Sequence, residues 1–256
     1  MTNEQFYSTH GQDQWVIERV FPGKRNGWFV DSGAGPDGIQ SSNSYALESQ
    51  FGWTGLLVEA LEESSALIRK NRSAILEQCC LNNTYGEVDF VIHEWPGLSS
   101  MPQHLSEPDL VGARFDREQF RKVRVAAVPL WELLRRHKAP PVIDYLSLDI
   151  EGAEWIVLKD FPFDEFRFLA MTIERNAKFY NKLRAKLRHE EYRLVEVHGP
   201  DDFYVHESVD YPMSAKEKLD AQVRSLWNTI YYREPLLTLR RGARWIRDRS
   251  PHSKRE

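Results

Sequence analysis

Short apolar runs alternate with amphipathic segments through most of the chain. Runs rich in aliphatic and aromatic residues predict strands at residues 28–31, 56–59, 75–81, 86–92, 123–128, 142–148, 168–173, 192–197 and 202–206. Between them, helical periodicity is expected at residues 45–51, 62–71, 130–137, 151–159 and 177–189. This alternation is typical of βαβ units, in which helices cover a mostly parallel sheet. The last two runs are joined by residues 198–201, which predict a hairpin and therefore an antiparallel final strand.

The pattern predicts one α/β domain over residues 1–210 and two smaller segments after it. Residues 211–239 are expected to form a helical extension, with a helix over 215–232 that ends before Pro235. Residues 240–256 contain seven Lys or Arg and two acids. We interpret this basic tail as a solvated end, and the alternative is a segment that contacts an anionic surface. Residues 101–119 are polar and are expected to form a loop or a lid.

Charge and composition exclude several classes of protein. The formal net charge is −4, so no basic excess is present to neutralise nucleic-acid phosphates. No apolar run approaches the roughly 18 residues of a membrane span, and the polar first residues do not resemble a signal peptide. The only cysteines are the adjacent Cys79 and Cys80, which excludes a disulfide scaffold. We therefore expect a cytoplasmic protein.

A glycine-rich segment follows the first predicted strand. Residues 33–38 match the G-x-G-x-x-G pattern, which lets the backbone turn sharply and approach a nucleotide closely. The second strand ends at Glu59, where a carboxylate can bind both hydroxyls of a ribose. A dinucleotide would bring its pyrophosphate against Asp31 and Asp37, whereas S-adenosylmethionine (SAM) carries an ammonium and a sulfonium. The charges therefore favour SAM over NAD.

Several segments together resemble the FkbM-type methyltransferase family. They are residues 8–13 (STHGQD), 29–34 (FVDSGA), 42–48 (SNSYALE), 52–59 (GWTGLLVE), 146–154 (LSLDIEGAE) and 172–176 (TIERN). The resemblance runs from about Tyr7 to Val205. It implies a Rossmann-like, SAM-dependent methyltransferase that acts on a hydroxyl oxygen of a sugar, glycan or natural product. The glycine loop is one residue longer than the family commonly has, which leaves the role of Asp37 open.

Four acids end predicted parallel strands: Asp31, Glu59, Asp149 and Glu174. Ligands of open α/β sheets bind at this edge, so we expect SAM to engage the first two and the acceptor to face Asp149 and Glu174. One of these two carboxylates can remove the hydroxyl proton of the acceptor. Alternatively, both can hold Mg²⁺ or another divalent cation together with Asn176, which would lower the hydroxyl pKa.

Further residues complete the predicted site. The candidate cofactor-binding residues are Asp31, Gly33, Ala34, Gly35, Asp37, Asn43, Glu59 and Asn82. His10 is a candidate catalytic residue if the N-terminal segment folds over the loop. Glu151 and Glu154 are interpreted as acids at a helix N-terminus, where they complement the helix dipole. Two other functions remain as alternatives: an NAD(P)-binding oxidoreductase and a non-catalytic SAM-binding module.

Overall fold

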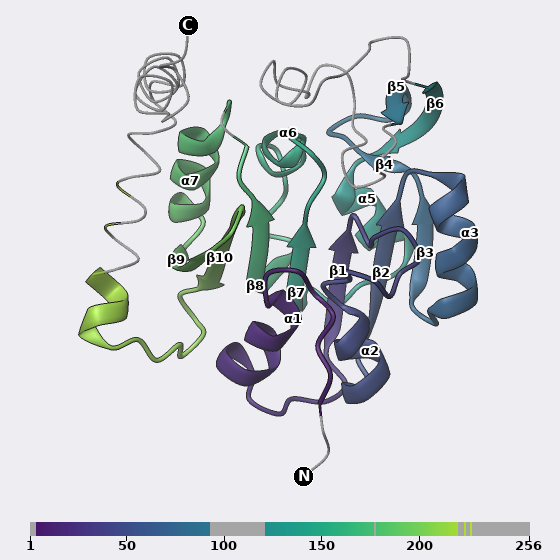
Figure 1. The fold of residues 1–256 in the computed structure, drawn as a ribbon. Coiled ribbons are helices and arrows are strands. Elements are labelled where there is room, and N and C mark those ends of the chain that lie inside the picture. Colours follow the sequence, from purple (N-terminus) through teal and green to yellow (C-terminus); the bar gives the residue numbers. More distant parts are fainter. Residues whose placement is uncertain (1–3, 93–120, 177, 220–222, 224–225, 227–256) are drawn as a thin grey trace, which may run out of the picture.

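A computed structural model describes residues 4–92, 121–176 and 178–219, together with residues 223 and 226. Its larger sheet has seven strands in the order β3-β2-β1-β7-β8-β10-β9 (Figure 1). These strands are β1 (Trp28–Ser32), β2 (Thr54–Glu59), β3 (Ile75–Gln78), β7 (Val142–Leu148), β8 (Arg167–Glu174), β9 (Tyr192–His198) and β10 (Asp201–His206). The five strands from β3 to β8 are parallel neighbours, and β10 is antiparallel to both β8 and β9. The predicted α/β class and the antiparallel final strand are confirmed.

Chain order reverses at the centre of this sheet. From β1 the chain proceeds outward to β2 and β3, and from β7 it proceeds in the opposite direction to β8. Asp31 lies level with Ser147 across the β1–β7 pair, and Ser32 lies level with Leu148. The carboxyl ends of β1 and β7 thus meet at a topological switch point, where sheets of this kind bind ligands.

Helices cover both faces of the sheet, as in a Rossmann-like fold. The helices α5 (Leu130–Arg136), α6 (Glu154–Leu158) and α7 (Tyr180–His189) pack on one face, against strand residues such as Leu146 and Met171. The other face is covered by α1 (Gln12–Trp15), the π-helical segment η1 (Val16–Val20), α2 (Tyr45–Phe51) and α3 (Glu62–Asn71). Because β1 and β7 are covered on both faces, their side chains are almost all buried, which explains their continuous apolar runs.

The predicted strand over residues 75–81 is wrong as a single element. It divides at Cys79 into β3 and the short β4 (Cys80–Leu81), which belongs to a separate three-stranded sheet with β5 (Gly86–Ile92) and β6 (Arg121–Val128). The division lets this small sheet lean over the carboxyl end of the large one, where Phe90 packs with Leu61 and Ala153. Periodicity cannot show such a change of partner, because both halves are extended.

Three helices also differ from the predictions. Helix α7, expected over residues 177–189, begins at Tyr180. The N-terminal helix was not predicted, yet it begins after Gly11 and buries Trp15 and Val16 against the sheet. The helix expected from residue 151 begins only at Glu154, because Glu151 and Gly152 both adopt positive φ angles (55° and 99°) that no α-helix accommodates.

The remaining predicted segments fall partly or wholly beyond the described residues. The loop or lid at residues 101–119 and the basic tail at 240–256 lie outside them, and the helix expected over 215–232 is described only in part. Among the described residues, no helix combines the length and apolar character that crossing a bilayer requires.

Candidate active site at the carboxyl ends of the strands

The glycine loop begins where β1 and β7 meet. Gly33 has a φ of +87°, and its N–H donates to the carbonyl of Val58 on β2 (3.2 Å). The amide of Asp149, just after β7, donates to the carbonyl of Ser32 (3.1 Å). A Cβ atom at position 33 would collide with the carbonyl oxygen of Asp149. Glycine is therefore needed at this position both for its backbone conformation and for the close approach of two strand ends.

A cavity opens between this loop, the end of β2 and the segment after β7. The residues that line it are Gly33, Gly35, Pro36, Val58, Glu59, Ala60, Leu61, Ser64, Cys79, Cys80, Leu81, Phe90, Asp149, Ile150, Glu151 and Ala153. Four predicted site residues thus share one cavity, whose apolar end is formed by β4 and Phe90.

Asp31 and Glu59 occupy different positions relative to this cavity. Glu59 lies in its wall and accepts a hydrogen bond from the amide of Leu61 (2.8 Å). Asp31 is fully buried behind the loop, where one carboxylate oxygen accepts a hydrogen bond from Ser44 Oγ (2.6 Å). Burial raises the pKa of Asp31 to about 6 and that of Glu59 to about 7. A cationic ligand beside them would stabilise both carboxylates in their charged form.

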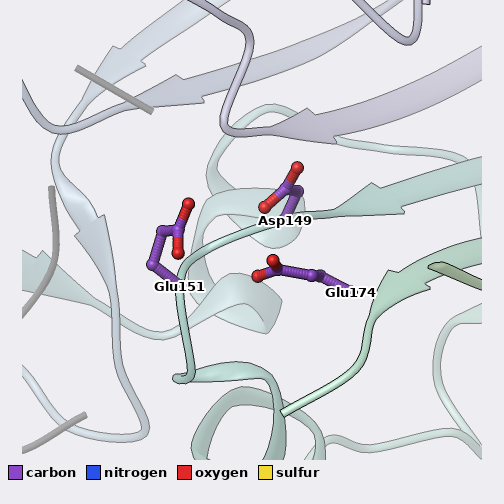
Figure 2. Close-up of side chains that lie close together, drawn as sticks. All are labelled: Asp149, Glu151 and Glu174. Atoms are coloured by element: carbon purple, nitrogen blue, oxygen red, sulfur yellow. The ribbon is translucent and has the colours of Figure 1, made fainter. Parts of the chain in front are cut away.

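Three carboxyl groups converge beside the cavity: Asp149 and Glu151 line it, and Glu174 lies next to them without lining it (Figure 2). One oxygen from each of Asp149, Glu151 and Glu174 lies within 4.8 Å of the other two. Burial, followed by the charge of Asp201, raises the pKa of Asp149 to about 7, and a hydrogen bond with Glu174 opposes this shift. Burial and then the charge of Asp149 raise the pKa of Glu174 well above its ordinary value. The pair can therefore take up and release a proton near neutral pH, as a general base must.

The N-terminal segment reaches the same edge of the sheet. The ring of His10 packs against Gly199, and its charge favours the ionised form of Asp201, whose pKa is raised by burial. Gln12 donates from its side-chain amide to the Asp201 carboxylate (2.7 Å), and Asp201 lies level with Glu174 in the β8–β10 pair. His10 thus lies beside the site, as the sequence predicts for a folded-over segment, while its catalytic role stays a prediction.

Five other predicted residues do not line the cavity. Ala34 is fully buried in the core that α1 and α2 cover. The Asp37 carboxylate accepts from the amides of Ile39 and Gln40, within its own loop. Asn43 donates to Ser147 Oγ (2.9 Å), and Asn82 accepts from the next amide along the chain. The fifth is Asn176.

Asn176 is the least well placed of the predicted metal ligands. Its side-chain oxygen accepts a hydrogen bond from the amide of Lys178 (3.0 Å), in a local turn after β8. The third carboxylate beside Asp149 and Glu174 is Glu151, which the sequence interpretation assigned to a helix N-terminus. Glu154 does take that structural role: it accepts from the amides of Gly152 and Ile150.

Sequence reasoning missed Glu151 and Asp201. A signal for Glu151 was present, since it follows Asp149 by two residues and precedes a glycine that turns the chain back toward the strand ends. Asp201 had no such signal. It reaches the site only because β10 inserts between β8 and β9, which brings it beside Glu174.

Of the comparisons with known proteins, the match to a family model indicates methyl transfer. Comparison with curated proteins gives no match. Among solved structures, a precorrin-6y C5,15-methyltransferase from Geobacter metallireducens aligns with 9% identity and a TM-score of 0.35, covering 75% of this chain and 84% of that one. The sequence profile of the Methyltransferase FkbM domain matches residues 31–194, which span the glycine loop, the cavity and all three converging acids. The chain therefore belongs to the FkbM methyltransferase family.

Proposed function

We propose that this protein transfers the methyl group of SAM to a hydroxyl oxygen of a sugar, glycan or natural product. The observation that carries the proposal is the cavity at the switch point, which the glycine loop, Glu59 and Asp149 line, with Glu174 hydrogen-bonded to Asp149 beside it. Methyltransferase families generally use SAM as the donor, and the acidic surroundings suit a ligand that carries an ammonium and a sulfonium.

In this proposal Glu59 recognises the ribose of SAM. Its carboxylate lies in the cavity wall at the end of β2, one strand away from the glycine loop. One of its oxygens accepts from the amide of Leu61, which holds the carboxylate in place at the cavity wall for the ribose hydroxyls. The apolar residues beyond it, including Leu61 and Phe90, suit the flat adenine ring.

The Asp149–Glu174 pair serves as the base in the transfer step. As the bond from acceptor oxygen to methyl carbon forms, the bond from that carbon to the SAM sulfur breaks, and the hydroxyl proton passes to a carboxylate of the pair. Neutral S-adenosylhomocysteine and the methyl ether remain. The raised pKa of Asp149, about 7, matches a base that must accept this proton near neutral pH and then release it.

A divalent cation is the alternative means of activating the hydroxyl. Three carboxylate oxygens, from Asp149, Glu151 and Glu174, form a donor set that suits Mg²⁺ or Mn²⁺. A bound cation would lower the pKa of a coordinated hydroxyl, so the carboxylates would act as ligands and not as the base. Dialysis against a chelator distinguishes the two: activity should persist if the pair is the base, and metal-dependent recovery would favour the cation.

Calorimetry tests the donor. Wild-type protein should bind SAM and S-adenosylhomocysteine, and neither NADH nor NADPH. Glu59→Gln should weaken SAM binding by roughly 1.5–3 kcal/mol, the value of a charge-assisted hydrogen bond. Glu62→Gln is the matched control, because this exposed acid begins the next helix and does not line the cavity. Binding of NADH in place of SAM would favour the oxidoreductase alternative.

Turnover tests the reaction. Asp149→Asn should retain SAM affinity and lose methyl transfer to a panel of hydroxyl-bearing sugars and natural products, followed as S-adenosylhomocysteine release. SAM binding without turnover on any acceptor would favour the non-catalytic module. Full activity in both Asp149→Asn and Glu174→Gln would refute the role of the pair.

A further inference from the structure

Arg72 is a buried cation beside the glycine loop. It follows the last turn of α3, and none of its side chain is exposed to solvent. It does not line the cavity. A buried guanidinium requires a full set of acceptors, because its desolvation is otherwise strongly unfavourable. The positions of these acceptors show what the side chain holds together.

The guanidinium donates to four groups on the loop and on α2. Its Nε donates to Glu48 (2.7 Å), and Nη1 donates to the carbonyl of Gly38 (2.8 Å) and to Ser42 Oγ (3.2 Å). Its Nη2 donates to Ser44 Oγ (2.9 Å). The planar fork of arginine suits this arrangement, because it presents several donors at fixed angles to one another.

Three of these acceptors connect Arg72 to the segments that surround the proposed SAM site: the glycine loop, the start of α2 and the end of β1. Gly38 ends the glycine loop, and a Cβ atom there would lie only 3.0 Å from Arg72 Cγ. Ser42 Oγ accepts from the amide of Tyr45 at the start of α2 (3.1 Å). Ser44 Oγ accepts from Arg72 and donates to the Asp31 carboxylate (2.6 Å), which links the cation to the acid at the end of β1.

Glu48 anchors the opposite side of the guanidinium. Its second oxygen accepts from the amides of Ser73 and Ala74, which follow Arg72 directly. Burial alone would raise the pKa of Glu48, but the charge of Arg72 and the hydrogen bonds from Arg72 and Ser73 together outweigh burial and lower it. The carboxylate is therefore charged at neutral pH, and the ion pair ties α2 to the segment after α3.

We propose that Arg72 is a positioning residue for the methyl donor: it holds the end of the glycine loop and, through Ser44, the Asp31 carboxylate. This inference rests on the proposed function. Its physical basis is preorganisation, since a loop that is already fixed loses less conformational freedom when a ligand binds. Replacement of Arg72 should therefore weaken SAM binding although the side chain does not reach the cavity.

The test compares SAM affinity with stability in matched variants. Calorimetry with SAM and thermal denaturation without ligand are measured for wild type, Arg72→Met, Arg72→Lys, Ser44→Ala and Leu187→Ala. The last is the control, because Leu187 is fully buried on α7, on the opposite face of the sheet. Arg72→Met and Ser44→Ala should raise the Kd for SAM about tenfold, the effect of losing one well-made hydrogen bond. Leu187→Ala should lower Tm and leave the Kd unchanged.

Two further readouts separate positioning from general stability. Arg72→Lys keeps the charge but cannot reach all four acceptors, so its Kd should lie between those of wild type and Arg72→Met. The pH below which SAM binding weakens should rise in Arg72→Met and Ser44→Ala, because the cation and the hydroxyl both favour charged Asp31. Two other groups act on the pKa of Asp31: Ser147 lowers it and Asp13 raises it. Asp31 in turn raises the pKa of Glu59, Tyr145 and Asp149. None of these five residues is substituted in the variants.

The outcomes are distinguishable. If Arg72→Met does not fold, Ser44→Ala breaks the same connection by removing a single oxygen atom. Wild-type Kd and pH dependence in Ser44→Ala, together with a lowered Tm, would overturn the inference and leave the proposed function intact. Failure of the wild-type protein to bind SAM would overturn the proposed function and this inference with it.

Discussion

Replacement of Gly33 by alanine tests the geometry on which the site depends. Two effects act at this position. A non-glycine residue at a φ of +87° lies in the left-handed region, which costs about 1–2 kcal/mol for an L-residue. The new Cβ would also lie far inside the ~3.5 Å contact distance of the Asp149 carbonyl oxygen and 3.2 Å from its carbonyl carbon.

The collision between the new Cβ and the Asp149 carbonyl cannot be relieved by a rotamer change, because the carbonyl is part of the backbone and the Cβ is bonded directly to it. The ends of β1 and β7 must separate, which weakens the hydrogen bond from the Asp149 amide to Ser32 and that from Gly33 to Val58. Loss of one such bond adds about 1 kcal/mol. Gly33→Ala should therefore lower the free energy of unfolding by about 2–4 kcal/mol in total, within the range of severe single substitutions.

Gly23→Ala isolates the conformational part of this cost. Gly23 has a φ of +68°, and a Cβ there would meet no atom within 4 Å. Its substitution should cost only about 1–2 kcal/mol. Denaturant unfolding of both variants, with midpoints and slopes compared to wild type, measures the difference. Equal destabilisation by the two substitutions would refute the claim that Gly33 is required for the close approach of β1 and β7.

Two further predictions concern buried charges elsewhere in the fold. Asp202→Ala should cost about 3–5 kcal/mol because it breaks an ion pair with Arg175 (3.0 Å) in which the Asp202 carboxylate is buried, whereas Glu87→Ala, in an exposed ion pair, should cost less than about 1 kcal/mol; denaturant midpoints compare them. Burial raises the pKa of Asp149 and Glu154 to about 7, so the folded protein retains protons that the unfolded chain releases. The free energy of unfolding without ligand should therefore fall as pH rises from about 4 to 7, and Glu154→Gln should reduce this dependence; a stability that rises over the same interval would contradict it.

Local chemistry in the sequence determined the sheet and one rim of the site. Strands β1, β2, β7 and β8 are mostly apolar and have an acid at or next to their carboxyl ends. Because parallel strands bring these ends to one edge, the sequence alone could place Asp31, Glu59, Asp149 and Glu174 there. Gly33 could also be recognised from the sequence, because the G-x-G-x-x-G pattern that it begins lies between a predicted strand and a predicted helix.

The partners of these residues were decided only by the tertiary structure. Asp201 joins the acids because β10 inserts between β8 and β9, a choice of strand order that leaves no trace in periodicity. Arg72 lies far along the chain from Asp31, and the packing of α3 beside the glycine loop alone brings them together through Ser44. Hydrophobic pattern specifies which face of an element is buried, but contacts between polar side chains depend on how elements are arranged in space, and that arrangement is a property of the whole fold.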